Sequence, residues 1–99
     1  MKLQVSKEAA KWYKDELDLE ENSPIRFYVR YGGVGGNLPG FSLGVAVQEP
    51  ENKHASVIVE GVSFYVETKD AWYFEDKDLK VQMNNKLAEP AFKYTSLNK

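Results

Sequence analysis

The stretch that decides the fold is Arg30–Val47, RYGGVGGNLPGFSLGVAV, which contains six of the seven glycines of this 99-residue chain. Glycine adopts positive φ at little steric cost, whereas Pro39 fixes its own φ and lacks an N–H donor. Apolar runs stand on both sides of the glycines. The stretch is therefore predicted to be a shaped, glycine-rich loop between two strands.

Period-two patterns predict both strands. Ile25–Tyr31 alternates apolar and polar residues, as a strand with one buried face does. Phe41–Gln48 is the second predicted strand, and small residues on one of its faces indicate close approach of another element. The residues expected on the buried face of the first strand are Ile25, Phe27, Val29 and Tyr31, and the small residues of the second are Ser42, Gly44 and Ala46.

Upstream of the loop the sequence predicts one helix. Ser6 is a good N-cap for a helix over Lys7–Leu17, and Glu8 lies in its first turn, where the helix dipole favours a carboxylate. The helix is expected to end near Asp18–Glu21, before a turn at Asn22-Ser23-Pro24.

Downstream, Ser56–Glu60 and Val62–Glu67 flank Gly61, which fits either two strands at a tight turn or one strand kinked by glycine. A short helical turn is expected from Thr68 through Tyr73, and Leu79–Met83 alternates as the last strand. The tail, residues 84–99, is expected to lie over the core through its apolar residues. These are Leu87, Phe92, Tyr94 and Leu97.

Composition narrows the classes of function. A chain of this length with 42% hydrophobic residues suits one domain, residues 1–99. The net charge of −2 and the pI near 5.4 argue against nucleic acid and anionic membranes as partners. There is no cysteine, so the chain supplies no thiolate for zinc or an iron–sulfur cluster. The charged N-terminal stretch resembles neither a signal peptide nor a membrane span, so the cytoplasm is the expected location.

Two local motifs suggest chemistry and fail on context. Gly33 and Gly35 begin a dinucleotide-binding pattern, but Leu38 occupies the third glycine position and a strand follows where a helix is needed. Gly40–Gly44 matches the G-x-S-x-G nucleophile elbow, which requires a strand-to-helix turn. Ser42 is instead followed by a strand-like run, so a structural role in a sheet is predicted for it.

Two further groups of residues could form a metal site or a binding groove, and each has a simpler interpretation. His54, the only histidine, lies in a polar segment with Glu49 and Glu51, where a solvated side chain is the simpler interpretation. The aromatic residues around Phe27, Phe64 and Trp72 could line a binding groove, but core packing is the favoured use.

Three stretches resemble the HesB-like, or IscA-like, A-type iron–sulfur carrier family. They are Val5–Ala10, Ile25–Gly33 leading into Gly40–Val45, and Val59–Val66. In that family a cysteine stands two residues before the Gly-Phe pair, where this chain has Leu38, and a Cys-Gly-Cys follows near the C-terminus, where this chain has no cysteine. The resemblance implies a single β-rich α+β domain with one N-terminal helix packed on twisted, mostly antiparallel or mixed sheets.

No nucleophile, base and orienting group can be assembled from these residues, and no thiolate is present, so we expect no enzyme activity, no cofactor and no bound metal. The first hypothesis is a cysteine-less accessory protein of iron–sulfur cluster assembly that docks on a cysteine-bearing assembly component. Assembly of several copies of this chain into a homo-oligomer is also left open. The alternative is a small-ligand or hard-metal binder that uses Tyr31, His54, Tyr94 and nearby carboxylates. The residues predicted to form the binding surface of loop and tail are Tyr31, Gly35, Gly36, Asn37, Leu38 and Tyr94.

Overall fold

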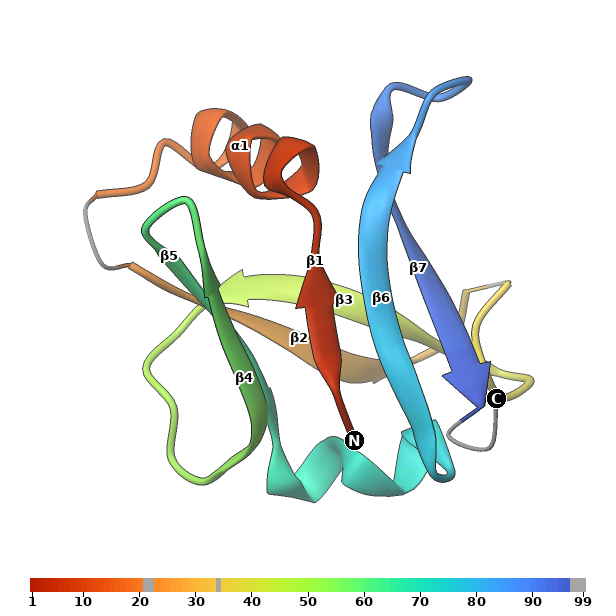
Figure 1. Cartoon of the computed structure of the whole chain (residues 1–99). Helices are drawn as coiled ribbons and strands as arrows, with labels where there is room; N and C mark the ends of the chain where they lie inside the picture. The colour runs from red at the N-terminus through yellow and green to blue at the C-terminus, as the bar shows by residue number, and fades with distance from the viewer. Residues whose placement is uncertain (21–22, 34, 97–99) are drawn as a thin grey trace.

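The computed structural model describes residues 1–20, 23–33 and 35–96. In chain order its elements are β1 (Leu3–Val5), α1 (Lys7–Glu16), β2 (Pro24–Tyr31), β3 (Phe41–Val47), β4 (Lys53–Val59), β5 (Val62–Glu67), the 3₁₀ helix η1 (Thr68–Phe74), β6 (Lys77–Asn84) and β7 (Glu89–Ser96). The strands form two mixed sheets, with α1 at one end of the molecule and η1 at the other (Figure 1). The predicted α+β class is confirmed.

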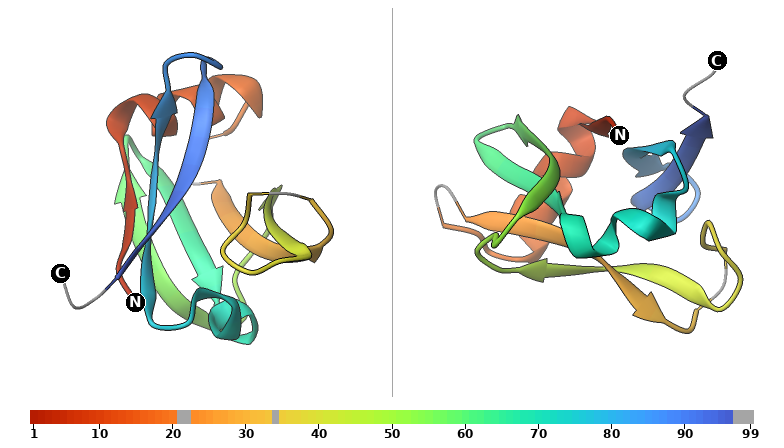
Figure 2. Two further views of the ribbon diagram at one scale, coloured as in Figure 1. Left: turned by 90° about the vertical axis from the view of Figure 1, so that its right-hand side faces the viewer. Right: turned by 90° about the horizontal axis from the view of Figure 1, so that it is seen from below.

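One sheet has three strands in the order β1-β6-β7, and the other has four in the order β3-β2-β5-β4. Within them β1 runs parallel to β6 and β2 parallel to β5, while the other neighbours are antiparallel. The views in Figure 2 show the β2–β3 hairpin reaching out beside β7 with the glycine-rich loop at its tip. The glycine-rich stretch therefore joins two strands, as predicted.

Leu79–Met83 was predicted to be the last strand, but it lies in β6, and the tail adds one more strand after it. Residues 89–96 form β7, which pairs with β6 and brings Phe92 opposite Val81. Pro90 weakens the strand pattern of the tail, but a proline is tolerated here because β7 is the edge of its sheet. Leu97, expected over the core, lies outside the described residues.

The helix begins as predicted and ends earlier. The Ser6 hydroxyl accepts a hydrogen bond from the Ala9 N–H at 3.1 Å, which caps the first turn. The last helical residue is Glu16, and Asp18 already has a φ of 48° in the left-handed region, which stops the helix before the range predicted for its end. Of the turn predicted to follow, Asn22 lies outside the described residues.

Aromatic rings join the helix to both sheets in the core. Phe27 of β2 stacks on Phe64 of β5 with ring centroids 5.7 Å apart, and it meets Phe92 of β7 edge-on at 5.6 Å. Tyr13 of α1 contacts both Phe27 and Phe64, each at 5.9 Å. These contacts bury the apolar face of α1 against both sheets.

The alternation in β2 predicts correctly that Ile25 and Phe27 are buried, but two other residues of the strand differ from the pattern. Tyr31 is 88% exposed because it lies at the projecting end of the hairpin. Arg26, on the other face, is buried because Asp70 of η1 accepts its hydrogen bond at 2.8 Å. The small residues of β3 have the predicted close neighbour: a Cβ on Gly44 would lie 2.5 Å from the ring of Tyr28.

Gly61 separates two strands, which settles one of the alternatives left open by the sequence. Glu60 and Gly61 both have positive φ, 53° and 75°, as the two central residues of a tight hairpin turn do. The first of these strands begins earlier than predicted, so His54 lies in β4 and not in a turn.

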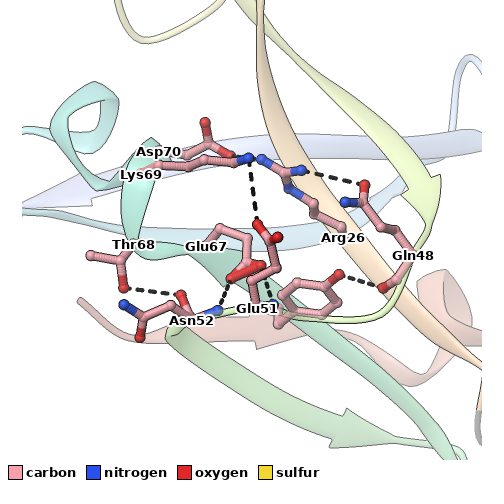
Figure 3. A network of polar contacts seen from close by, with 9 residues as sticks. Arg26, Gln48, Glu51, Asn52, Glu67, Thr68, Lys69 and Asp70 are labelled. Carbon is pink, nitrogen blue, oxygen red and sulfur yellow. Dashed lines mark hydrogen bonds and ion pairs between the residues drawn. The ribbon is translucent and has the colours of Figure 1, made fainter.

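A second loop, Gln48–Asn52, is held by Glu67, the last residue of β5 (Figure 3). Its carboxylate accepts hydrogen bonds from the N–H groups of Glu51 at 2.6 Å and Asn52 at 2.8 Å. Burial alone would raise the pKa of Glu67, which is 2% exposed, but these two bonds and the nearby charge of Arg26 hold it below its ordinary value. Glu67 is thus a buried, ionised clamp.

Candidate protein-docking surface

The glycine loop, residues 32–40 apart from the undescribed position 34, is closed at its base by its own backbone. The N–H of Gly32 donates to the carbonyl of Gly40 at 2.7 Å, and the N–H of Phe41 donates to the carbonyl of Leu38 at 3.2 Å. Gly33 and Gly35 have φ of 84° and 79°, which residues with a side chain rarely adopt. Glycine is therefore needed for the path of this loop.

Tyr73 of η1 fixes the middle of the loop. Its hydroxyl accepts a hydrogen bond from the N–H of Asn37 at 2.7 Å, and its carbonyl accepts one from the Asn37 side chain at 2.8 Å. The Asn37 side-chain oxygen in turn accepts from Lys77 at 2.9 Å. Gly36 comes so close that a Cβ there would overlap the carbonyl of Phe41 and lie 2.5 Å from the Tyr73 hydroxyl.

The tail reaches the same place through Tyr94 of β7. The hydroxyls of Tyr73 and Tyr94 are 3.0 Å apart and share a hydrogen bond. Burial and this bond raise the pKa of Tyr94, so its hydroxyl is neutral at physiological pH. Loop, η1 and tail thus meet at Tyr73, which is completely buried.

Three aromatic side chains beside this junction form what we call the aromatic ridge: Tyr31, Phe41 and Trp72. The ring centroids of Tyr31 and Phe41 are 5.8 Å apart, and those of Phe41 and Trp72 are 5.3 Å apart, both edge to face. Tyr31 is 88% exposed and Trp72 is 53% exposed. Tyrosine and tryptophan at exposed sites are the residues most often found as anchors in protein interfaces.

A hollow of about 410 Å³ lies beside the loop. Gly35, Gly36 and Tyr94 line it together with Arg30 and Ser42. The Ser42 hydroxyl accepts a hydrogen bond from the Arg30 side chain at 3.0 Å, and Ser42 lies within β3. The prediction that Ser42 is a structural residue of a sheet is therefore confirmed.

The predicted binding residues separate into three groups. Gly36, Asn37 and Tyr94 converge on Tyr73, and Gly35 lines the hollow beside them. Leu38 packs against the core, and Tyr31 belongs to the ridge.

The sequence analysis missed Phe41 and Trp72 as surface residues. The signal for Trp72 is the run of three consecutive aromatics, Trp72 to Phe74, on a short helix. Such a helix cannot bury three successive side chains on one side; Tyr73 and Phe74 are buried, and Trp72 points outward.

The hypothesis of a hard-metal or small-ligand site at Tyr31, His54 and Tyr94 is wrong. His54 lines a separate hollow with Met1 and Trp72, whereas Tyr94 lines the hollow beside the glycine loop. Within residues 1–20, 23–33 and 35–96, no three histidine, cysteine, aspartate or glutamate side chains are grouped so that they could hold a metal ion.

The geometry defines a class: a small α+β protein that presents aromatic side chains beside a fixed loop. The chain belongs to the family of a Bacillus subtilis protein named pyruvate dehydrogenase inhibitor. The two are 42% identical over 94 residues, which cover 95% of this chain and 99% of the relative.

Uncharacterised staphylococcal proteins are also similar. One from Staphylococcus saprophyticus is 33% identical over 93% of this chain and 97% of its own length, and one from Staphylococcus haemolyticus is 38% identical over 83% and 86%. No family model matches the chain.

These relatives overturn the resemblance to HesB-like and IscA-like iron–sulfur carriers, which was wrong. The glycine-rich stretch and the Gly-Phe-Ser segment that suggested it are explained by the hairpin and its close approach to Tyr73. The role in iron–sulfur assembly and the predicted assembly partner are wrong with it.

Proposed function

We propose that this protein is a non-catalytic regulator that binds pyruvate dehydrogenase and lowers its activity. The observation that carries the proposal is the 42% identity to a protein named as an inhibitor of that enzyme, along almost the whole of both chains. A regulator shares a compartment with its target, which we propose is the cytoplasm. In the described part of the chain, no helix is long and apolar enough to cross a membrane.

We further propose that the aromatic ridge and the glycine loop make the contact. The position of Trp72 in the ridge is fixed by its neighbour on η1, Tyr73, whose hydroxyl forms a hydrogen bond with the glycine loop at Asn37. A surface that is already rigid loses little conformational entropy on binding. The exposed Tyr31 and Trp72 rings offer large apolar areas for a partner to cover.

The test is a titration of pyruvate dehydrogenase purified from Bacillus subtilis with this protein. We expect saturable inhibition, and we expect Trp72→Ala to raise the half-inhibitory concentration about 30-fold, as loss of an interface anchor worth about 2 kcal/mol does. Ile58→Ala is the matched control, because Ile58 is also apolar and 73% exposed but lies on β4. It should change inhibition less than twofold.

An unrelated dehydrogenase assayed with the same protein stock excludes general inhibition by aggregates. The proposed function fails if a folded, stoichiometric excess of the protein leaves pyruvate dehydrogenase fully active. If Ile58→Ala weakens inhibition as much as Trp72→Ala does, the ridge is not the contact.

A further inference from the structure

Two adjoining hollows lie between the glycine loop and α1. The hollow of about 410 Å³ beside the loop and a second one of about 380 Å³ beside α1 share the lining residues Glu89, Pro90 and Phe92. Because the two hollows adjoin along these residues, we treat them together and call them the seam groove. The proposed loop surface therefore continues along the molecule as far as α1.

The groove lies where the two sheets fail to meet. On one side of the molecule β1 lies beside β4, so the sheets contact each other there (Figure 1). On the other side, β3 ends the four-stranded sheet and β7 ends the three-stranded sheet. Residues of both edge strands line the groove. Edge strands offer backbone groups that pair with an extended chain.

The charge along the groove changes from one end to the other, because Arg30 lines the half beside the glycine loop. The half beside α1 is apolar through Trp12, Leu17 and Phe92, and its two charged lining residues are Glu16 and Glu89, both acidic. Glu89 lies close enough to Tyr13 that its charge adds to burial in raising the pKa of that tyrosine. An apolar floor with two carboxylates suits an apolar segment that carries lysine or arginine.

We propose that the seam groove receives an extended apolar segment of the partner protein that carries lysine or arginine at the end lying beside α1. The inference rests on the proposed function for the identity of the partner, pyruvate dehydrogenase, but not for the chemistry of the segment. The ridge and the groove, both beside the glycine loop, then contact the partner together.

The first test uses a probe that does not depend on pyruvate dehydrogenase. A fluorescein-labelled peptide with two lysines at one end of a Val-Leu-Val core is titrated by fluorescence anisotropy, beside the same peptide with glutamates in place of the lysines. We expect the lysine peptide to bind at least tenfold more tightly. The double variant Glu16→Gln and Glu89→Gln should remove that preference.

Asp15→Asn is the matched control, because Asp15 is an exposed acid on the same helix that does not line the groove. It should keep the preference within twofold, and circular dichroism should show that all variants are folded. The proposal is overturned if the lysine peptide fails to bind at millimolar concentration or if its preference survives the double variant.

A second arm separates this proposal from the proposed function. If Glu16→Lys with Glu89→Lys inhibits pyruvate dehydrogenase as well as the unchanged protein, the groove does not receive the enzyme and the proposed function stands. If the unchanged protein binds the lysine peptide with the expected preference but never inhibits the enzyme, the proposed function fails and the chemistry of the groove is supported.

Discussion

The glycine loop and the loop Gln48–Asn52 are both irregular segments in which one buried side chain makes two hydrogen bonds, but the two clamps differ in charge. Tyr73 holds the first with a neutral hydroxyl and a carbonyl, at 2.7 and 2.8 Å from Asn37. Glu67 holds the second with an ionised carboxylate, at 2.6 and 2.8 Å from two backbone N–H groups (Figure 3). Hydrogen bonds to an ionised group are stronger than neutral ones.

The difference also shows in how close the chain comes to its clamp. The glycine loop approaches Tyr73 so nearly that Gly36 has no room for a side chain. The loop Gln48–Asn52 contains no glycine and is held by bonds alone, with further ones from Tyr65 to the Gln48 carbonyl and from Thr68 to Asn52. The first loop therefore depends on shape and the second on charge.

The largest expected effect tests the dependence on shape. Gly36→Ala should destabilise the fold by about 3 kcal/mol, because the new Cβ overlaps the Phe41 carbonyl, which cannot rotate away as a side-chain tip can. Gly35→Ala is the matched control: it meets open space and pays only for its φ of 79°, about 1 kcal/mol. Urea unfolding followed by circular dichroism measures both. Equal losses would show that backbone strain, not close approach, constrains the loop.

The dependence on charge is tested by Glu67→Gln, with an expected loss of about 2 kcal/mol. The amide keeps one acceptor oxygen but turns an NH₂ group toward the second backbone N–H, which is left without its acceptor. Hydrogen exchange of the amides of Glu51 and Asn52 should speed up in the variant. Unchanged exchange at both amides would mean that the loop does not need its clamp.

These clamps mark the limit of what the sequence predicts. The helix with its Ser6 cap and the strands around the glycines follow from local periods and capping chemistry, and the structure confirms them. At Gly61 the pattern left a turn and a kinked strand open, and the structure shows the turn. The roles of Tyr73 and Glu67 could not be predicted, because each depends on a partner 15 or more residues away. Arg26 is buried for the same reason, through a partner 44 residues along the chain.

The docking surface was predicted in part for a related reason. Six glycines in one stretch identify the loop, but the contact of the half-buried Phe41 with the exposed Trp72 depends on where the hairpin stands relative to η1. Local pattern cannot distinguish an aromatic that fills a core from one that covers another aromatic at the surface. The family could be identified only through similarity to a known relative. The glycine-rich pattern alone led to a different family, which was wrong.

A smaller effect is expected for the neutral clamp. Tyr73→Phe should cost about 1.5 kcal/mol, because the Asn37 N–H loses its acceptor while the ring stays in place. The second bond, from the Asn37 side chain to the carbonyl of residue 73, survives the substitution. Unfolding in urea gives the stability, and hydrogen exchange at Asn37 should rise. A loss above that of Glu67→Gln would reverse the ranking of the two clamps.

The smallest expected change is in how stability depends on pH, and it separates the clamps directly. The folded-state pKa of Glu67 lies below its ordinary value of 4.5, so its contribution is fully present above pH 4.5 and is lost as pH falls through the folded-state pKa. The stability difference between the unchanged protein and Glu67→Gln should therefore shrink between pH 5 and pH 3, as urea unfolding at each pH measures. The difference from Tyr73→Phe should stay constant over that range, because the hydrogen bond that it removes joins a hydroxyl oxygen to the backbone N–H of Asn37 and involves no carboxylate. If both differences shrink together, acid loosens the whole fold and the two loops are not held in different ways.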